Sequence, residues 1–382
     1  MNRRYYKREI PEYPIPSCDQ MSREKAAKAY NLTLAATDRL RLEVKISNGE
    51  EISAWAGSSH FDEQTVGELA GGPFSTGALG SFLMDIFDVS NTRFDFDGED
   101  VMAGIKLFRY RYQVPRDSSH YMVKAGRDWR VTAYDGAIWV DPHSFELIRL
   151  SVRTAELPAE TGACETSTMV EYAATPIGAG SFLLPRQSDL HFLLRNTTEN
   201  EISIAYSSCR QFVGEAKLVT DPGAIDQKPA DAPIAPIPIP PGLELPLKLE
   251  QSIDTDTAAA GDVVLAKVSK PVGPVKSRDV VIPAGSVVRG RIVRMEHWLN
   301  SPSRFVIAIE LDTVEINGVP SPLYATMAQG QPRGRQIFLP PPGQSRPASI
   351  IAHESKAKHD VIPRGYAMNW VTISAPDSAA KP

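Results

Sequence analysis

Hydrophobic and polar residues alternate along several segments in the first half of the chain. Such a period of two is typical of a β-strand with one buried and one solvated face. The clearest segments are 39–46, 108–114 and 148–153. We expect the apolar faces of the last two to form a surface that binds an apolar ligand. Its residues are Phe108, Tyr110, Tyr112, Ile148, Leu150 and Val152.

One segment of the first half has the periodicity of a helix. In 76–87, apolar residues recur at spacings of three and four, as on one stripe of an α-helix. A weaker helix candidate covers 21–30. Asp135-Gly136 predicts a hairpin turn, and short turns between strands give an antiparallel meander. The sequence therefore predicts an α+β half-barrel over 15–220, in which a curved antiparallel sheet wraps a helix.

The second half contains an internal repeat. Ile-Pro-x-Gly occurs at 239–242, 282–285 and 362–365, each time before a strand-like run. With proline second and glycine fourth in a type I turn, the repeat predicts strands that begin at turns. We therefore expect a small all-β barrel or sandwich over 241–375. The predicted fold class of the whole chain is mainly β with some α.

Proline is unusually frequent, with 31 of 382 residues. Seven of these prolines lie in 222–242. They predict a semi-rigid, Pro-rich linker at 221–240 between the two domains. A second, weakly patterned stretch at 330–361 carries several basic residues. We expect a long loop there, which is either disordered or solvated or else contacts an anionic group.

Net charge and hydropathy exclude two classes of protein. The formal net charge of −5 argues against a nucleic-acid partner, because such a protein needs a basic face. No apolar run approaches the roughly 20 residues of a membrane-spanning helix, so we expect no transmembrane segment.

Searches for catalytic and ligand-binding motifs give nothing specific. The chain contains no G-x-x-x-x-G-K-[ST] loop, no G-x-S-x-G elbow and no H-E-x-x-H motif. The acidic residues of 95–100 lack the ligand spacing of a calcium loop, and we interpret them as a solvated turn. The sequence therefore predicts no catalytic residue, no metal site and no cofactor.

The three cysteines, Cys18, Cys164 and Cys209, are too far apart for a zinc motif. In an exported protein, a disulfide between Cys18 and Cys209 would join the two ends of the first domain and leave Cys164 free. Three free thiols are the alternative. No apolar segment of a signal peptide follows the basic start. The expected location is periplasmic or secreted if a leader is missing from the given start, and cytoplasmic otherwise.

Three phrases of the first half resemble those of uncharacterised two-domain secreted bacterial proteins. They are ELAGGPFSTGALGSFLMDIF at 68–87, FRYRYQVP at 108–115 and YDGAIWVDPHSFELIRLSV at 134–152. Their arrangement looks like the LolA-like half-barrel of lipoprotein carriers. This resemblance implies a sheet that cups helices and lines a groove for a lipid-like chain.

The second half resembles the β-barrel domain of the outer-membrane-complex subunit of type IV secretion systems. The similarity lies in GLELPLKLEQSI, GDVVLAKVSKPV and VVIPAGSVVRGRI within 239–373. The chain departs from that family in two respects: it has no anchoring helix before the proline stretch, and it has no long apolar insertion that could form pore helices. The resemblance implies an envelope location and protein contacts rather than catalysis.

Three interpretations of function remain open. The first is a non-enzymatic cell-envelope protein for binding or assembly, which holds an apolar ligand, a lipid-like chain or a segment of an envelope partner protein. The second is an enzyme whose site is assembled from distant residues. The third is a structural or regulatory module that binds another protein through a sheet edge.

Overall fold

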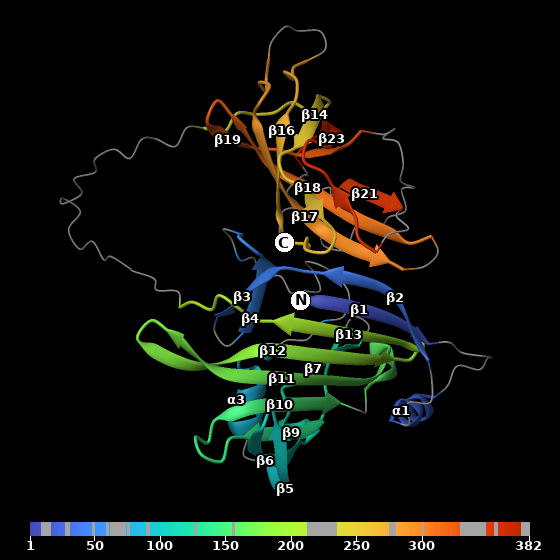
Figure 1. Ribbon diagram of the computed structural model, residues 1–382, viewed down its shortest axis with the longest axis vertical. Coiled ribbons are helices and arrows are strands. Elements are labelled where there is room, and N and C mark those ends of the chain that lie inside the picture. Colours follow the sequence, from blue (N-terminus) through green and yellow to red (C-terminus); the bar gives the residue numbers. More distant parts are fainter. Residues whose placement is uncertain are drawn as a thin grey trace, which may run out of the picture. The chain divides into compact units, whose positions relative to one another are not determined.

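The structure of the chain is a computed structural model (Figure 1). It describes residues 1–8, 17–26, 31–47, 50–58, 61, 74, 77–88, 92–125, 128–154, 157–211, 235–274, 280–299, 302–328, 349–354 and 358–375. The chain divides into two compact units. The first comprises Met1–Cys209 with Glu296–Arg304, and the second comprises Arg210–Met295 with Phe305–Pro382. The fold is mainly β and antiparallel, which confirms the fold class predicted from the alternating pattern.

One antiparallel sheet dominates the first unit, and Figure 1 shows its strands stacked from β5 to β2. In spatial order they are β5 (Arg93–Met102), β6 (Ile105–Val114), β9 (Tyr134–Val140), β10 (Leu147–Thr154), β11 (Ala163–Ile177), β12 (Gly180–Leu194), β13 (Thr198–Ala205), β1 (Asn2–Arg8) and β2 (Leu32–Arg39). Residues 2–8 lie outside the predicted first domain, yet β1 pairs on both sides, with β2 and β13.

Among its described residues, the first unit also contains two small hairpins and two helices. The hairpins are β3 (Leu42–Ser47) with β4 (Glu50–Trp55), and β7 (Met122–Ala125) with β8 (Asp128–Val131). The helices are α1 (Cys18–Ala26) and α3 (Ser81–Asp88). Short 3-10 turns cover Arg116–Ser118 and Ala159–Thr161. Both helices overlap the segments predicted to be helical.

The main core of the first unit lies between α3 and the sheet. Phe82 and Ile86 of α3 pack with buried residues of β6, β9, β10 and β11. Full burial of such side chains contributes about 1.5–3 kcal/mol each. The apolar stripe predicted at 76–87 therefore faces the sheet. Tyr112, Leu150 and Val152 belong to the same core.

The structure corrects two details of the predicted strands. Asp135-Gly136 is no hairpin turn but part of β9, because Gly136 pairs with both Tyr112 and Val152. The register of β9 against β10 shifts between Leu147 and Arg149. The shift turns both Leu147 and Leu150 into the core and leaves Ile148 outside the core cluster.

The predicted disulfide is wrong. Cys18 is bonded to Cys164, and Cys209 is a free, exposed thiol. The reason is the position of α1: its Met21 packs against Cys164 and Leu193, which places Cys18 beside β11. Cys209 does not belong to this cluster.

The second unit is an antiparallel, barrel-like sheet. Its main strands, in spatial order, are β20 (Ala325–Met327), β23 (Ala367–Thr372), β14 (Glu244–Leu249), β16 (Val263–Val268), β17 (Val287–Trp298), β18 (Arg304–Ile316) and β21 (Ser349–Glu354). The last residues of β17, from Glu296, and the first residue of β18, Arg304, belong to the first unit. The first and last strands of this order, β20 and β21, contact each other. The short strands are β15 (Ile253–Asp254), β19 (Val319–Pro322) and β22 (Val361–Ile362). Leucine, isoleucine and valine side chains fill the interior around Trp370, which is fully buried.

The Ile-Pro-x-Gly repeat forms turns that lead into strands, as its sequence predicts. Gly242, Gly285 and Gly365 have φ of 85°, 87° and 82°. In the second repeat, Ser286 N–H donates to the Pro283 carbonyl at 3.3 Å. The turn thus begins at proline rather than isoleucine. Glycine takes its third position, where a positive φ favours glycine.

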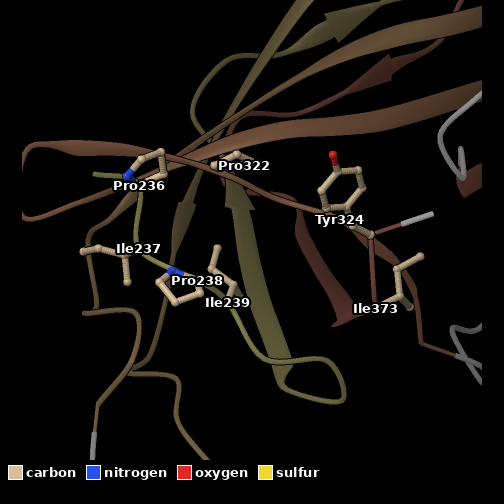
Figure 2. Close-up of a pocket in the computed structure, with 8 residues that line it drawn as sticks. Pro236, Ile237, Pro238, Ile239, Pro322, Tyr324 and Ile373 are labelled. Atoms are coloured by element: carbon tan, nitrogen blue, oxygen red, sulfur yellow. The ribbon is translucent and has the colours of Figure 1, made fainter. Parts of the chain in front are cut away.

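The chain enters the second unit through the end of the proline-rich stretch. Residues 212–234, which contain most of the predicted linker, lie outside the described residues. From 235 onward, Ile237 and Ile239 pack against the core, and Ile237 N–H donates to the Ser321 hydroxyl at 2.9 Å. An apolar pocket of about 260 Å³ borders this segment (Figure 2). Its lining is Pro236, Ile237, Pro238, Ile239, Pro322, Tyr324, Ile373 and Ala375.

Within the predicted loop at 330–361, the structure describes β21 and residues 358–361. The rest of that loop, and with it the predicted anionic contact, lies outside the described residues. Among the residues described, no helix has the length and apolar character needed to cross a membrane.

Candidate functional site

Strand β5 lies at an edge of the first unit's sheet. It pairs with β6 along Arg93–Met102, and no other described strand pairs with it. Exposed edges are usually protected, because their unpaired backbone groups can accept another strand. Phe94, Phe96 and Val101 of β5 are nevertheless exposed. Among the described strands, β5 is therefore an edge strand with exposed apolar side chains.

The exposed apolar residues of β5 continue onto its neighbours. Met84 and Phe87 of α3 are 62% and 54% exposed, and Phe94 and Phe96 are 39% and 59% exposed. Phe108 and Tyr110 of β6 are partly buried beside them. We call these six residues, Met84, Phe87, Phe94, Phe96, Phe108 and Tyr110, the aromatic face.

Ring contacts hold the aromatic face together. The rings of Phe87 and Phe94 stack at 5.6 Å between centroids and link α3 to β5. Phe96 makes edge contacts with Phe108 at 5.8 Å and with Tyr110 at 5.4 Å. Offset and edge-on pairs at these distances stabilise by about 0.5–1.5 kcal/mol beyond burial. The rings are therefore held in place with their outer surfaces exposed.

The aromatic face runs into the core at Tyr112. The ring of Phe94 lies 6.3 Å from that of Tyr112, which is 1% exposed. The Tyr112 hydroxyl donates to the Ser151 carbonyl at 2.7 Å. Burial raises the pKa of Tyr112 well above that of a free tyrosine. The phenol is thus a neutral donor and an anchor of the core.

The start of α3 is anchored from two sides. The Glu51 carboxylate of β4 accepts hydrogen bonds from the backbone N–H groups of Gly77 and Leu79, at 2.9 and 3.0 Å. Burial raises the pKa of Glu51, and the two hydrogen bonds act against that rise. Tyr172 of β11 donates to the Ala78 carbonyl at 2.9 Å. These contacts fix α3, and with it the exposed Phe87.

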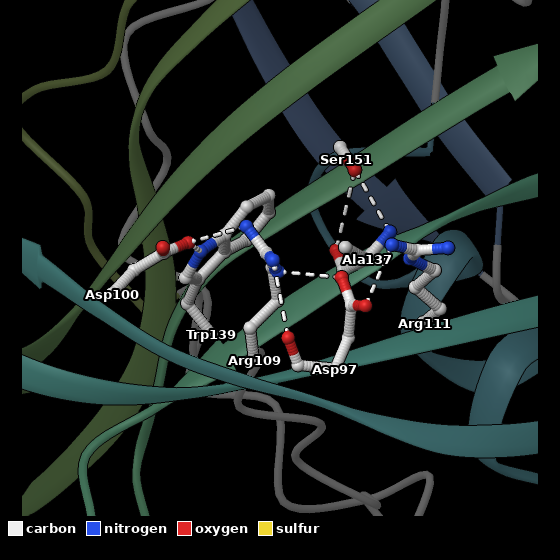
Figure 3. Close-up of polar contacts among 7 residues, drawn as sticks. All are labelled: Asp97, Asp100, Arg109, Arg111, Ala137, Trp139 and Ser151. Carbon is white, nitrogen blue, oxygen red and sulfur yellow. Dashed lines mark hydrogen bonds and ion pairs between the residues drawn. The ribbon is translucent and has the colours of Figure 1, made fainter.

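The other face of β5 and β6 is charged (Figure 3). The Arg109 guanidinium contacts Asp97 at 2.7 Å and Asp100 at 2.9 Å, and Arg111 contacts Asp97 at 2.6 Å. Trp139 of β9 donates its indole N–H to Asp100 at 2.8 Å. These pairs are partly exposed, so solvent screens them and each contributes little to stability.

The electrostatics along β5 are uneven. Desolvation acts to raise the pKa of Asp97, but hydrogen bonds and charges from Arg111 and Arg109 outweigh it and hold that pKa below its usual range. Glu99 is paired with Lys106 of β6. Asp95 is exposed, and no described residue forms an ion pair with it. Arg111 lies opposite Asp95 in the strand register, but its guanidinium contacts Asp97, so Asp95 is the carboxylate of β5 without an ion pair among the described residues.

The structure brings only part of the predicted apolar surface to solvent. Phe108 and Tyr110 belong to the aromatic face, whereas Tyr112, Leu150 and Val152 are core residues under α3. Phe94 and Phe96 were not predicted, because the acidic run at 95–100 was interpreted as a solvated turn, whereas it lies in β5. The alternation of Arg93-Phe94-Asp95-Phe96-Asp97 is a strand signal that could have identified them.

Among the described residues, one group of possible metal ligands lies in the second unit. Single ligand atoms of Asp254, Asp256 and His359 lie within 4.8 Å of one another. Asp254 accepts the Asp256 N–H at 2.8 Å and contacts His359 at 3.0 Å. These contacts stabilise the turn after β15, which is a structural role for the group.

No protein family model, curated protein or solved structure matches this chain.

Proposed function

We propose that the protein is a non-enzymatic cell-envelope binding or assembly protein that holds an apolar ligand or partner segment on the aromatic face. The observation that carries this proposal is the ring arrangement at the sheet edge. Phe87, Phe94 and Phe96 come from two elements, are fixed by ring contacts and expose their outer surfaces. Contiguous exposed apolar patches commonly mark interaction sites.

Burial of the aromatic face by an occupant is energetically favourable compared with exposure to water. Fully burying a large apolar side chain contributes about 1.5–3 kcal/mol. Phe87 and Phe96 are each more than half exposed, as is Met84 of α3. Covering these residues supplies several kcal/mol toward binding, which offsets part of the cost of association.

Two further observations support an envelope location. The Cys18–Cys164 disulfide, with an S–S distance of 2.06 Å, is a bond that persists in oxidising compartments. The resemblance of the first half to lipoprotein carriers, and of the second half to a secretion-complex barrel, points to the same compartment. An exported carrier or assembly component fits both the disulfide and the two resemblances.

The test is a fluorescence titration of the full chain with anilinonaphthalenesulfonate. We expect saturable binding that weakens about tenfold in Phe96→Ser, because one aromatic contact of about 1.4 kcal/mol is lost. Phe182→Ser is the matched control, since Phe182 is also an exposed phenylalanine of this sheet but lies at the start of β12.

Circular dichroism would establish that both variants are folded. Equal affinities of Phe96→Ser, Phe182→Ser and the wild type would place the probe elsewhere and remove the support for this site. Absence of saturable binding to the wild type would contradict the proposed function.

A further inference from the structure

The pairing of β5 with β6 shows which side chains fit opposite those of β5. At the start of β5, residues 93–97, phenylalanines alternate with charged residues. Four of the five charged residues in 93–100 are acidic. Its partner β6 alternates basic with aromatic residues in IKLFRYRYQV. The register sets Phe94 against Tyr112, Asp95 against Arg111 and Phe96 against Tyr110. Aromatic pairs therefore occupy one face and opposite charges the other.

On the side away from β6, no described strand pairs with β5, and this edge presents the same side chains to a new strand. A strand that pairs there meets Phe94 and Phe96 on the face shared with α3, and it meets Asp95 on the charged face. Cross-strand aromatic pairs and opposite charges each contribute about 0.2–1 kcal/mol, and like charges repel. The best complement is a strand that alternates aromatic and basic residues, as β6 does.

A second copy of β5 is a poor partner by the same argument. In an antiparallel pair of two β5 strands, the acidic residues at 95–100 of one copy face those of the other. Like charges directly opposite each other destabilise a strand pair. The register shift between Phe96 and Glu99 also interrupts regular pairing there. Acidic residues and bulges are known protections of edge strands, and here they leave a basic partner as the compatible one.

We propose that the occupant of the aromatic face is an extended peptide segment that alternates basic and aromatic residues and adds to β5 as a new edge strand. This inference rests on the proposed function, because it names the partner of the same site. Backbone hydrogen bonds to β5 provide affinity. Aromatic contacts with Phe94 and Phe96 and an ion pair with Asp95 provide selectivity.

The probe is a labelled ten-residue peptide of alternating arginine and tyrosine, titrated into the full chain by fluorescence anisotropy. We expect saturable binding, at least about fivefold tighter than that of a peptide alternating glutamate and tyrosine. Asp95→Lys should reduce or reverse this preference. Asp189→Lys is the matched control, since Asp189 is also exposed on a strand of the same sheet but lies in β12, away from the edge.

A second peptide tests strand addition itself. The arginine–tyrosine peptide with every backbone nitrogen methylated keeps its side chains but donates no backbone hydrogen bond. We expect it to bind at least about tenfold more weakly, and we expect the unmodified peptide to protect β5 amides from hydrogen exchange. Equal affinities of the two peptides would overturn the inference, as would equal affinities for the basic and acidic peptides.

The two proposals fail in different ways. If anilinonaphthalenesulfonate binds in a Phe96-dependent manner but the basic peptide neither binds nor displaces it, the proposed function stands and this inference fails. A fluorescent fatty acid that binds under those conditions would identify the occupant as a lipid-like chain. If neither the probe nor any peptide binds, both proposals fail.

Discussion

The Tyr112 hydroxyl reaches the Ser151 carbonyl across the backbone of Gly136, with an O···O distance of 2.7 Å. A Cβ atom on Gly136 would lie 1.9 Å from that carbonyl oxygen and 2.7 Å from the hydroxyl. Glycine is therefore needed here for its lack of a side chain. The contact joins β6, β9 and β10 directly below the aromatic face.

Gly136→Ala should destabilise the first unit by about 3 kcal/mol, the upper end of the usual cost of overpacking. Tyr112→Phe removes the hydroxyl without crowding the strand and should cost only about 1 kcal/mol. Urea unfolding of the two variants measures both effects. A smaller loss in Gly136→Ala than in Tyr112→Phe would contradict the steric argument.

Cys18 and Cys164 should form the disulfide in protein prepared without reductant, with Cys209 free for alkylation. The bond closes a sequence separation of 146 residues, which gives an upper bound of about 5 kcal/mol in the chain-entropy model. Mass spectrometry of non-reduced peptides identifies the pair. Cys164→Ser should lower the unfolding midpoint and Cys209→Ser should not. A peptide linking Cys209 to either other cysteine would contradict this pairing.

The mainly β fold could be predicted from the sequence, because the alternation of apolar and polar residues depends only on which face of a strand is buried. The turns of the Ile-Pro-x-Gly repeat were predictable for the same reason, since Gly285 requires only local backbone freedom. The need for glycine at position 136 was not predictable, because it depends on Tyr112 and Ser151, which lie in other strands. Likewise, the pairing of Cys164 depends on where α1 docks.

In the aromatic face, too, the residues that could be predicted are those whose signal is local to one strand. Phe108 and Tyr110 were identified from alternation within their own strand. Phe94 was missed because its run of acidic neighbours has the composition of a turn, and the neutralising arginines lie on β6. Sequence periodicity can tell that a strand has an apolar face, but it cannot tell which part α3 covers. That depends on the anchoring of α3 by Glu51 and Tyr172.

Asp38→Ala should strongly destabilise the first unit. Arg3 and Asp38 form a bidentate pair between β1 and β2, with Nε–Oδ1 and Nη2–Oδ2 distances of 2.8 and 2.7 Å, and both side chains are buried. Tyr5 also donates to Asp38 at 2.9 Å. Removing one member of a buried ion pair typically costs about 3–5 kcal/mol, because the other charge stays buried.

The double variant Arg3→Met, Asp38→Leu provides the control for this prediction. It removes both charges and fills the space with apolar atoms, so it should recover most of the stability lost in Asp38→Ala. Urea unfolding of the wild type and both variants gives the comparison. A double variant as unstable as Asp38→Ala would show that the pair matters through geometry rather than through charge burial.

The first unit should lose stability above about pH 10, where the tyrosines of an unfolded chain ionise. Burial raises the pKa of Tyr206 to about 12, with Glu51 adding to the rise and the Ser188 hydrogen bond opposing it. Burial also raises the pKa values of Tyr112, Tyr134 and Tyr172. The folded state keeps these phenols protonated while the unfolded state releases their protons, so rising pH favours unfolding.

For Tyr206 this contribution is fully present below pH 10 and is lost as the pH rises toward 12. In that window each such tyrosine lowers the free energy of unfolding by about 1.4 kcal/mol per pH unit. Urea unfolding between pH 8 and pH 11.5, with tyrosinate absorbance followed in parallel, measures the slope. Tyr206→Phe should make the slope shallower by about that amount, because one of the ionising groups is gone. Identical slopes in the variant and the wild type would mean that Tyr206 ionises equally in the folded and unfolded states, and its burial would then have no effect on alkaline stability.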